Sequence, residues 1–388
     1  MTSTGIVSLQ RCETYDETIV EACLRQSIAD LGGLSKYINK GDRVLLKANL
    51  LMKKKPEDAT TTHPAVIKAL TSILIAHGAS VVIGDSPGGP FTEGMLHGIY
   101  AASGMERIAA ETGATLNFNT KACEKKNPNG LLLKNIVMTD MLNDVDKVIS
   151  VSKMKTHGMM AFTGAVKNMF GTVPGLTKAE YHLNMPEYAQ FADALIDICL
   201  CANPVLSFMD GITAMEGHGP SSGVPRQMNV LLASNDPFAL DKTACRIINL
   251  DESNVPILSQ AIKRGICTDN PDDLTLAGTP WTHFAVQDFD IPETRTVFSL
   301  IPLPKFMQRF AAYHLQPRPV FAYADCIGCA DCAKNCPAKI IEMRDHKPHV
   351  ALENCIRCFC CQELCPKKAV QSYRPRLLRL FSRPKRRG

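Results

Sequence analysis

Nine of the sixteen cysteines lie between Cys326 and Cys365, where a short cysteine motif occurs twice. Both copies read C-x2-C-x2-C-x3-C followed by proline, and their cysteines are Cys326, Cys329, Cys332 and Cys336 in the first and Cys355, Cys358, Cys361 and Cys365 in the second. This spacing lets three thiolates wrap around one four-iron cluster while the fourth cysteine reaches a neighbouring cluster. The motif therefore predicts two 4Fe-4S clusters.

The fourth cysteine of each copy is expected to cross over, which gives two ligand sets. The sets are Cys326, Cys329, Cys332 and Cys365 for one cluster, and Cys355, Cys358, Cys361 and Cys336 for the other. Zinc is the alternative, but zinc sites use thiolates in separate pairs and leave the triplets unexplained. Cys360 lies inside the second triplet, and we interpret it as a packing cysteine, with a role as an alternative ligand as the competing interpretation.

Polar side chains also follow the expected strands of the first 250 residues. Ligands of an open parallel sheet bind outside the carboxyl ends of the strands, so these positions are candidates for a binding site. The substrate-binding candidates are Lys47, Asn49, Asp85, Lys153, Asn168 and Asp210. The catalytic candidates are Lys155, His157 and Lys167.

The lysines among these candidates favour an anionic ligand. Alternation along a strand places Lys153, Lys155 and His157 on one face, and the glycine-rich stretch that follows can bring Lys167 back towards them. Neighbouring ammonium groups repel each other unless an anion joins them, and a carboxylate or phosphate gains charge-assisted hydrogen bonds there. The alternatives are a solvated strand end or an ion-pair network with the nearby aspartates.

The elements that must hold these residues indicate a layered α/β domain with a mainly parallel sheet, because short β-rich runs alternate with helical patterns. Strands are expected near residues 5–9, 43–50, 80–84, 145–151, 205–209 and 230–233, and helices near 64–77 and 185–201. Neither a Walker motif nor a G-x-G-x-x-G after a strand occurs, so nucleotide binding has little support.

Four segments are expected along the chain: an α/β domain with an anion or substrate pocket (1–250), a closing segment and linker (251–320), a small α+β two-cluster ferredoxin-like domain (321–373) and a basic tail (374–388). The tail carries seven Lys or Arg and no acid, which suits contact with an acidic protein or a peripheral contact with an anionic membrane surface.

Composition restricts the class of protein. With 45% hydrophobic and 21% charged residues and no apolar run of membrane-spanning length, the chain resembles a soluble globular protein, and its many thiolates favour a reducing cytoplasm. The net charge of +5 is uneven, because residues 321–388 carry 14 Lys and Arg against 6 Asp and Glu. Bound clusters would lower the net charge to roughly +1, so it gives no argument for nucleic-acid binding.

Two families resemble parts of this sequence. Residues 321–373 resemble bacterial two-cluster ferredoxins, which implies one-electron transfer with a redox partner protein. The segments LLKANLL, TTTHP, GDSPGG, SKMKTH, GAVKNMFG, MDGI, GHGP and NDPFALD resemble the domain of unknown function 362 family over roughly residues 40–250. Many members of that family carry a C-terminal pair of 4Fe-4S motifs without an assigned reaction.

The large domain also resembles, more distantly, the nickel-pincer lactate racemase. His157, Lys167 and His182 match its pattern of cofactor-binding residues, whereas GDSPGG with Asp85 replaces its second acid-base histidine. The resemblance implies a pocket for a small carboxylate, with a further organic cofactor or a nickel cofactor as a minor alternative. The leading hypothesis is an iron-sulfur oxidoreductase that acts on a small anionic ligand; the alternatives are a non-catalytic electron carrier or assembly protein, and a cofactor-dependent isomerase.

Overall fold

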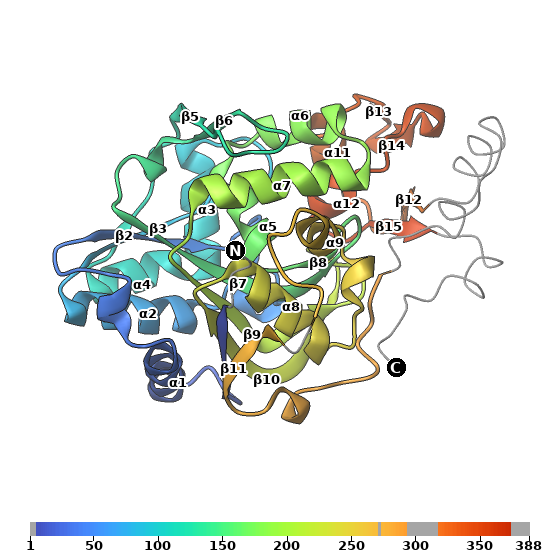
Figure 1. Ribbon diagram of the computed structural model, residues 1–388. Coiled ribbons are helices and arrows are strands. Elements are labelled where there is room, and N and C mark those ends of the chain that lie inside the picture. Colours follow the sequence, from blue (N-terminus) through green and yellow to red (C-terminus); the bar gives the residue numbers. More distant parts are fainter. Residues whose placement is uncertain (1–4, 271–272, 293–316, 374–388) are drawn as a thin grey trace.

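The computed structural model describes residues 5–270, 273–292 and 317–373, and Figure 1 shows their arrangement. A nine-stranded sheet in these residues forms the centre of the large domain, in the order β11-β1-β10-β9-β7-β2-β3-β4 with β8 beside β7. Its strands are β1 (Ile6–Arg11), β2 (Arg43–Ala48), β3 (Ser80–Gly84), β4 (Thr115–Leu116), β7 (Lys147–His157), β8 (Ala161–Thr163), β9 (Leu206–Glu216), β10 (Val224–Ser234) and β11 (Thr275–Gly278).

Most neighbouring strands of this sheet run parallel, which confirms the predicted α/β class. The pairs β7–β9, β2–β7, β2–β3, β3–β4 and β1–β11 are parallel. Within the described part of this sheet, the antiparallel pairs are those of β10 with β9 and β1 and of the short β8 with β7. The carboxyl ends of β2, β3 and β7 therefore meet at one edge, where a ligand site is expected.

Helices cover both faces of the sheet (Figure 1). One face packs against α1 (Glu17–Asp30), α2 (Pro64–His77), α3 (Glu93–Ser103) and α4 (Met105–Thr112). The opposite layer contains α5 (Ala165–Asn168), α6 (Thr177–Asn184), α7 (Tyr188–Ala202), α8 (Pro237–Ile247) and α9 (Pro256–Lys263). Strand alternation supplies both cores, since Val44 and Leu46 of β2 face the first layer and Leu45 faces the second.

Local sequence explains the α2 bounds, which match the predicted helix. Pro64 occupies the first turn, and Gly78 ends the helix in the left-handed conformation at φ 100°. The cap is His63, whose side chain accepts a hydrogen bond from Ala65 N. Thr62 instead joins the middle of β7 to the end of β2, because its hydroxyl donates to Val151 O at 2.7 Å and accepts from Asn49 N at 3.0 Å.

Residues after 250 complete the large domain. Helix α9 packs against α7 and α8, and β11 adds a parallel edge strand beside β1. A separate hairpin of β5 (Ala122–Lys126) and β6 (Asn135–Thr139) lies near the α7 layer (Figure 1). The remainder of the expected linker (293–316) and the expected basic tail lie outside the described residues.

The small C-terminal domain contains the two cysteine motifs. Its elements are the short helices α11 (Asp331–Lys334) and α12 (Cys360–Glu363), the hairpin β13 (Ile341–Arg344) and β14 (Lys347–Val350), and the pair β12 (Arg318–Phe321) and β15 (Val370–Tyr373). It packs on the large domain near α6 (Figure 1). Ser221 Oγ donates to Glu363 O at 2.7 Å, and Lys368 Nζ donates to Gly223 O at 3.2 Å, so hydrogen bonds fix the two domains together.

Candidate functional site

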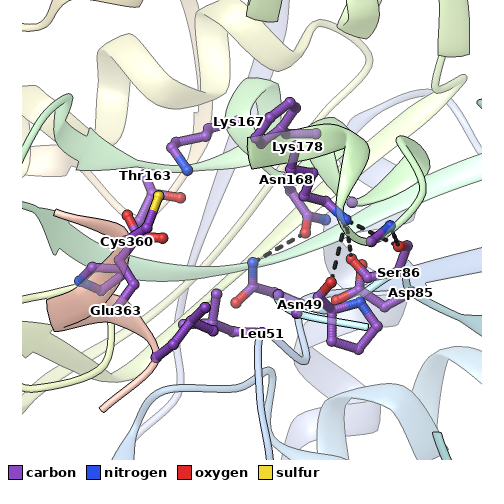
Figure 2. Close-up of a pocket in the computed structure, with 18 of the residues that line it drawn as sticks. Asn49, Leu51, Asp85, Ser86, Thr163, Lys167, Asn168, Lys178, Cys360 and Glu363 are labelled. Carbon is purple, nitrogen blue, oxygen red and sulfur yellow. Dashed lines mark hydrogen bonds between the residues drawn. The ribbon is translucent and has the colours of Figure 1, made fainter. Parts of the chain in front are cut away.

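A cavity with about 100 Å³ of space for water-sized molecules, partly open to solvent, lies between the carboxyl edge of the sheet and the small domain. Figure 2 shows Asp85 and Ser86 at one end and Cys360 and Glu363, from α12, at the other. Lys47, Asn49, Asp85, Lys155, Lys167 and Asn168 line it. We call this cavity the pocket; six of the nine sequence-predicted candidates from the large domain therefore meet in it.

Lys47 and Asp85 form a buried ion pair at the floor of the pocket. Lys47 Nζ lies 2.7 Å from Asp85 Oδ1, and it also donates to Ala48 O and to Asn168 Oδ1. Asp85 Oδ2 accepts from Leu50 N at 2.8 Å. Burial lowers the pKa of Lys47, and the carboxylate of Asp85 opposes that shift. The pair is therefore charge-balanced and holds the ends of β2 and β3 together.

Gly171 allows the backbone to approach this ion pair. A Cβ atom at Gly171 would overlap with Asp85 Oδ1 and Lys47 Nζ. Ser86 N donates to Gly171 O at 2.9 Å, which fixes the segment over the pair. A residue with a side chain at this position would displace the pair or the loop.

Two further lysines, Lys155 and Lys178, have only neutral hydrogen-bond partners. Lys155 Nζ donates to Asn49 Oδ1 and Thr60 O, each at 2.7 Å. Lys178 Nζ donates to Ser86 O at 2.8 Å and Ser86 Oγ at 2.9 Å. Burial, with neighbouring lysines adding to it, lowers the pKa of each to about 7. An anion in the pocket would restore the protonated form of both.

Sequence reasoning missed Lys178, which lies on α6 three residues after Gly175. Its position in a short helix, rather than at a strand end, gave no functional signal. The signal that was available is the glycine, because a Cβ atom at Gly175 would lie 2.8 Å from Gly89 O and from Phe91 N. That close approach brings the start of α6 against the loop after β3.

Lys167, on α5, has no hydrogen-bond partner within the described residues, and its ammonium lies 5.7 Å from the centre of the Phe170 ring. Burial lowers its pKa, and the carboxylate of Glu363 from the small domain opposes the shift. Asn168, the next residue, donates to Lys47 O at 2.9 Å and to Ser150 Oγ at 3.1 Å. Helix α5 thus fixes one side chain to the sheet and presents the other to the pocket.

His157 and Glu363 connect the two domains beside the pocket. His157 Nδ1 accepts hydrogen bonds from Met159 N and Met160 N, so the neutral ring carries its proton on Nε2. That nitrogen lies 2.8 Å from Glu363 Oε1. Burial lowers the pKa of His157 to about 4, and the histidine and Lys167 hold the pKa of Glu363 at about 2 against the effect of burial. Glu363 is therefore an ionised carboxylate supplied by the small domain.

His182 also reaches the pocket. Its side chain is buried, and Nδ1 has no hydrogen-bond partner in the described part of the chain. The ring packs against Phe191, with centroids 4.3 Å apart. Burial lowers its pKa to about 4, so the ring is neutral at physiological pH.

The structure places Lys153 and Asp210 outside the pocket. Lys153 Nζ lies 2.8 Å from Asp210 Oδ2, and both contact the Tyr15 hydroxyl, at 2.9 Å each. Tyr15 in turn stacks on His63 at 3.5 Å between ring centres. The pairing of β7 with β9 shifts register between Lys153 and Lys155, and the two lysines bind different partners. Lys153 and Asp210 thus form part of a structural ion-pair network, one of the alternatives considered above.

The cysteines of the first predicted ligand set surround one small cavity. Cys326, Cys329, Cys332 and Cys365 line it together with apolar side chains such as Ile327. Four convergent thiols with an apolar wall fit a four-iron cluster. In the second set, Cys336 and Cys361 pack in one apolar cluster, and Cys358, three residues before Cys361, is also buried.

Cys360 lines the pocket between cysteines of the second set. It is buried, and the hydrogen bond that its thiol donates to Cys358, followed by burial, raises its pKa. Cys360 therefore packs against its neighbours and also forms part of the pocket wall.

The fold and the cysteine sites define a two-domain iron-sulfur protein. Residues 44–246 match the domain of unknown function (DUF362), and residues 318–366 match a 4Fe-4S dicluster domain. The chain belongs to the DUF362 family. The dicluster match confirms two 4Fe-4S clusters and an iron-sulfur electron carrier.

Known proteins resemble the chain to different degrees. A thylakoid-associated protein of Synechocystis sp. is 33% identical over 293 residues, which cover 74% of this chain and 88% of that protein. The lactate racemase apoprotein of Thermoanaerobacterium thermosaccharolyticum matches 63% of this chain and 57% of its own, with 13% identity and a TM-score of 0.39. A Thermotoga maritima crystal structure matches 59% and 58%, with 14% identity and a TM-score of 0.33. No helix in the described residues is both long and apolar enough to span a membrane.

Replacing Gly171 by alanine is expected to destabilise the protein by about 1–3 kcal/mol, because the new methyl group overlaps with the Lys47–Asp85 pair. Gly94→Ala is the matched control, since Gly94 lies in α3 with open space around its Cβ position and alanine favours helix. Urea unfolding under anaerobic conditions compares the two variants. Equal midpoints for both would contradict the packing described for Gly171.

Cys329→Ser is expected to lower the iron content from about eight to about four atoms per chain, because it removes a ligand of one cluster. Cys360→Ser is expected to keep about eight, since the second set has its four cysteines without Cys360. Iron and acid-labile sulfide analysis after anaerobic purification measures both. Loss of iron in Cys360→Ser would show that the ligand assignment is wrong.

Anion binding to the pocket is expected to weaken as pH rises. Lys155 and Lys178, with pKa values of about 7, lose their protons above that pH, and binding a dicarboxylate requires the charged forms. Affinity should therefore fall between about pH 6 and about pH 9, and binding near pH 8 should take up protons. Calorimetry in two buffers with different ionisation enthalpies tests this. Constant affinity without proton uptake would contradict it.

Proposed function

We propose that this protein is an iron-sulfur oxidoreductase that exchanges electrons between a redox partner and a small anionic ligand bound in the pocket. The observation that carries the proposal is that α12, the helix of the second cysteine motif, forms one end of the pocket through Cys360 and Glu363. The lysines of the large domain form the rest. The lysines and the helix of the second cysteine motif thus line the same pocket.

The charges of the pocket support an anionic ligand. Lys47, Lys155, Lys167 and Lys178 line it, against two carboxylates, Asp85 and Glu363. Asp85 balances Lys47 and Glu363 lies near Lys167, so Lys155 and Lys178 remain with neutral partners. A ligand with two negative charges, such as a dicarboxylate or a phosphate monoester, would balance them.

The same lysines suit proton-coupled reduction. When bound, each 4Fe-4S cluster takes up or releases one electron, so two clusters match an organic ligand that accepts two electrons and two protons. Lys155 and Lys178 line the pocket, and with pKa values of about 7 they can donate protons to a bound ligand near neutral pH. A one-electron carrier supplies the electrons, and solvent returns the protons to the lysines. A reducing cytoplasm suits this chemistry.

A non-catalytic electron carrier is the second candidate, favoured by the match of the small domain to a dicluster ferredoxin module. In that case, the pocket lysines have a structural role only. The two candidates differ in whether the pocket binds a small ligand, because a carrier needs none.

Lys155→Met and Lys167→Met are expected to weaken binding of a dicarboxylate by about ten- to a hundredfold, since each lost charge-assisted bond is worth about 1.5–3 kcal/mol. Methionine keeps most of the apolar stem, so the comparison tests charge. Calorimetry with the best dicarboxylate or phosphate monoester from a thermal-shift screen gives the affinities.

Lys36→Met is the control for this experiment, because Lys36 is exposed and lies outside the pocket. It should bind the ligand as the wild type does. Wild-type affinity in the two pocket variants would place the binding site elsewhere. A screen in which no ligand binds would favour the second candidate, a non-catalytic electron carrier.

A further inference from the structure

The two copies of the cysteine motif share their spacing but differ in the residues between the cysteines. Ala330 and Lys334 of the first copy correspond in position to Phe359 and Glu363 of the second. Phe359 is buried, whereas Lys334 is exposed. At these two positions, the first copy has small or solvated side chains and the second copy has side chains that contact other parts of the protein. Asn335 is the residue of the first copy that lines the pocket.

The second copy faces the large domain. Glu363 Oε1 lies 2.8 Å from His157 Nε2, and Glu363 O accepts from Ser221 Oγ at 2.7 Å. Gln362 Nε2 donates to His218 O at 3.5 Å. Helix α12 is therefore covered by the large domain and the pocket, and it offers no open surface to another protein.

The first copy faces solvent. Cys329 is exposed, in contrast to the buried Cys358 at the same position of the second copy. Ile327 is 59% exposed and Tyr323 is 49% exposed, although both are large apolar residues. The Tyr323 hydroxyl donates to Pro348 O at 3.1 Å, and Pro348 and Ile327 line the same cysteine cavity, so the two side chains flank that cavity.

We propose that this surface, the docking face formed by Tyr323, Ile327 and Cys329, binds a small electron-carrier protein whose own redox group lies near its surface. Electron transfer weakens steeply with distance, and the large domain covers the opposite side, so a donor has to approach here. Each encounter moves one electron: the carrier is oxidised by one electron, and this protein is reduced by one. A small apolar patch also suits the limited interfaces of transient redox complexes.

This inference rests on the proposed function for the direction of transfer, but its docking face can be tested alone. The test uses the holoprotein and a plant-type 2Fe-2S ferredoxin as the probe. Ile327→Glu should weaken ferredoxin binding at least tenfold in calorimetry, because it places a charge in an apolar contact, and should slow reduction by reduced ferredoxin to a similar extent. Reduction by dithionite, which needs no docking, should still go to completion, which shows that the clusters are present and reducible.

Leu131→Glu is the matched control, because Leu131 is 61% exposed and lies in the large domain, and the substitution changes the net charge equally. It should bind ferredoxin as the wild type does. Ile327→Ser provides a second variant without added charge, and iron analysis checks that each variant keeps its clusters. Unchanged ferredoxin affinity in both Ile327 variants, or no binding to the wild type, would overturn the inference, as would sedimentation data showing that Ile327 mediates self-association.

The same variants separate this inference from the proposed function. Ile327→Glu should bind the pocket ligand with wild-type affinity, because Ile327 lies outside the pocket. Loss of ferredoxin binding with intact ligand binding supports the docking face. Ferredoxin binding that depends on Ile327, together with no anion binding, would support the docking face and contradict the proposal of an oxidoreductase.

Discussion

The repulsion between buried ammonium groups is the constraint on which the site depends. Lysine side chains gathered at a sheet edge are stable only where oxygen atoms surround them. The chain supplies a carboxylate for Lys47, amide and carbonyl oxygens for Lys155, and backbone and hydroxyl oxygens for Lys178. Glu363, on the small domain, lies 2.8 Å from His157, and its negative charge opposes the lowered pKa of Lys167. The electrostatics of the pocket thus require both domains.

This dependence links the two halves of the molecule physically. The second cysteine copy cannot be moved from the large domain without exposing Glu363 and leaving His157 Nε2 without its partner. In the described part of the chain, no ion pair joins the first copy to the large domain in this way, although Asn335 lines the pocket, and Cys329 is exposed. One repeat thereby fixes a cluster site beside the pocket, and the other leaves a cluster site open to solvent. The asymmetry gives the small domain an inner side and an outer side.

The sequence predicts the features that depend on local spacing. The cysteine motifs predict two clusters, and Pro64 with Gly78 predicts the helix bounds of α2. Strand positions follow the apolar runs, although β7, β9 and β10 extend further than expected, and the added residues of β9 and β10 pair with each other. Lys153 pairs with Asp210 whereas Lys155 lines the pocket, so the predicted lysine group is divided between two sites, which strand alternation alone does not reveal. Glu363 was not predicted as a site residue, since its contact with His157 spans 206 positions of the chain and depends on domain packing.

The most direct test is electron paramagnetic resonance of the reduced Cys329→Ser variant, titrated with the best pocket ligand. This variant is expected to retain the cluster of the second cysteine copy, whose helix α12 forms a wall of the pocket. We expect that saturating ligand changes the g-values of the remaining signal and that Lys155→Met in the same background abolishes the change. A signal that is identical with and without bound ligand would contradict the claim that the pocket and the second cysteine copy act together.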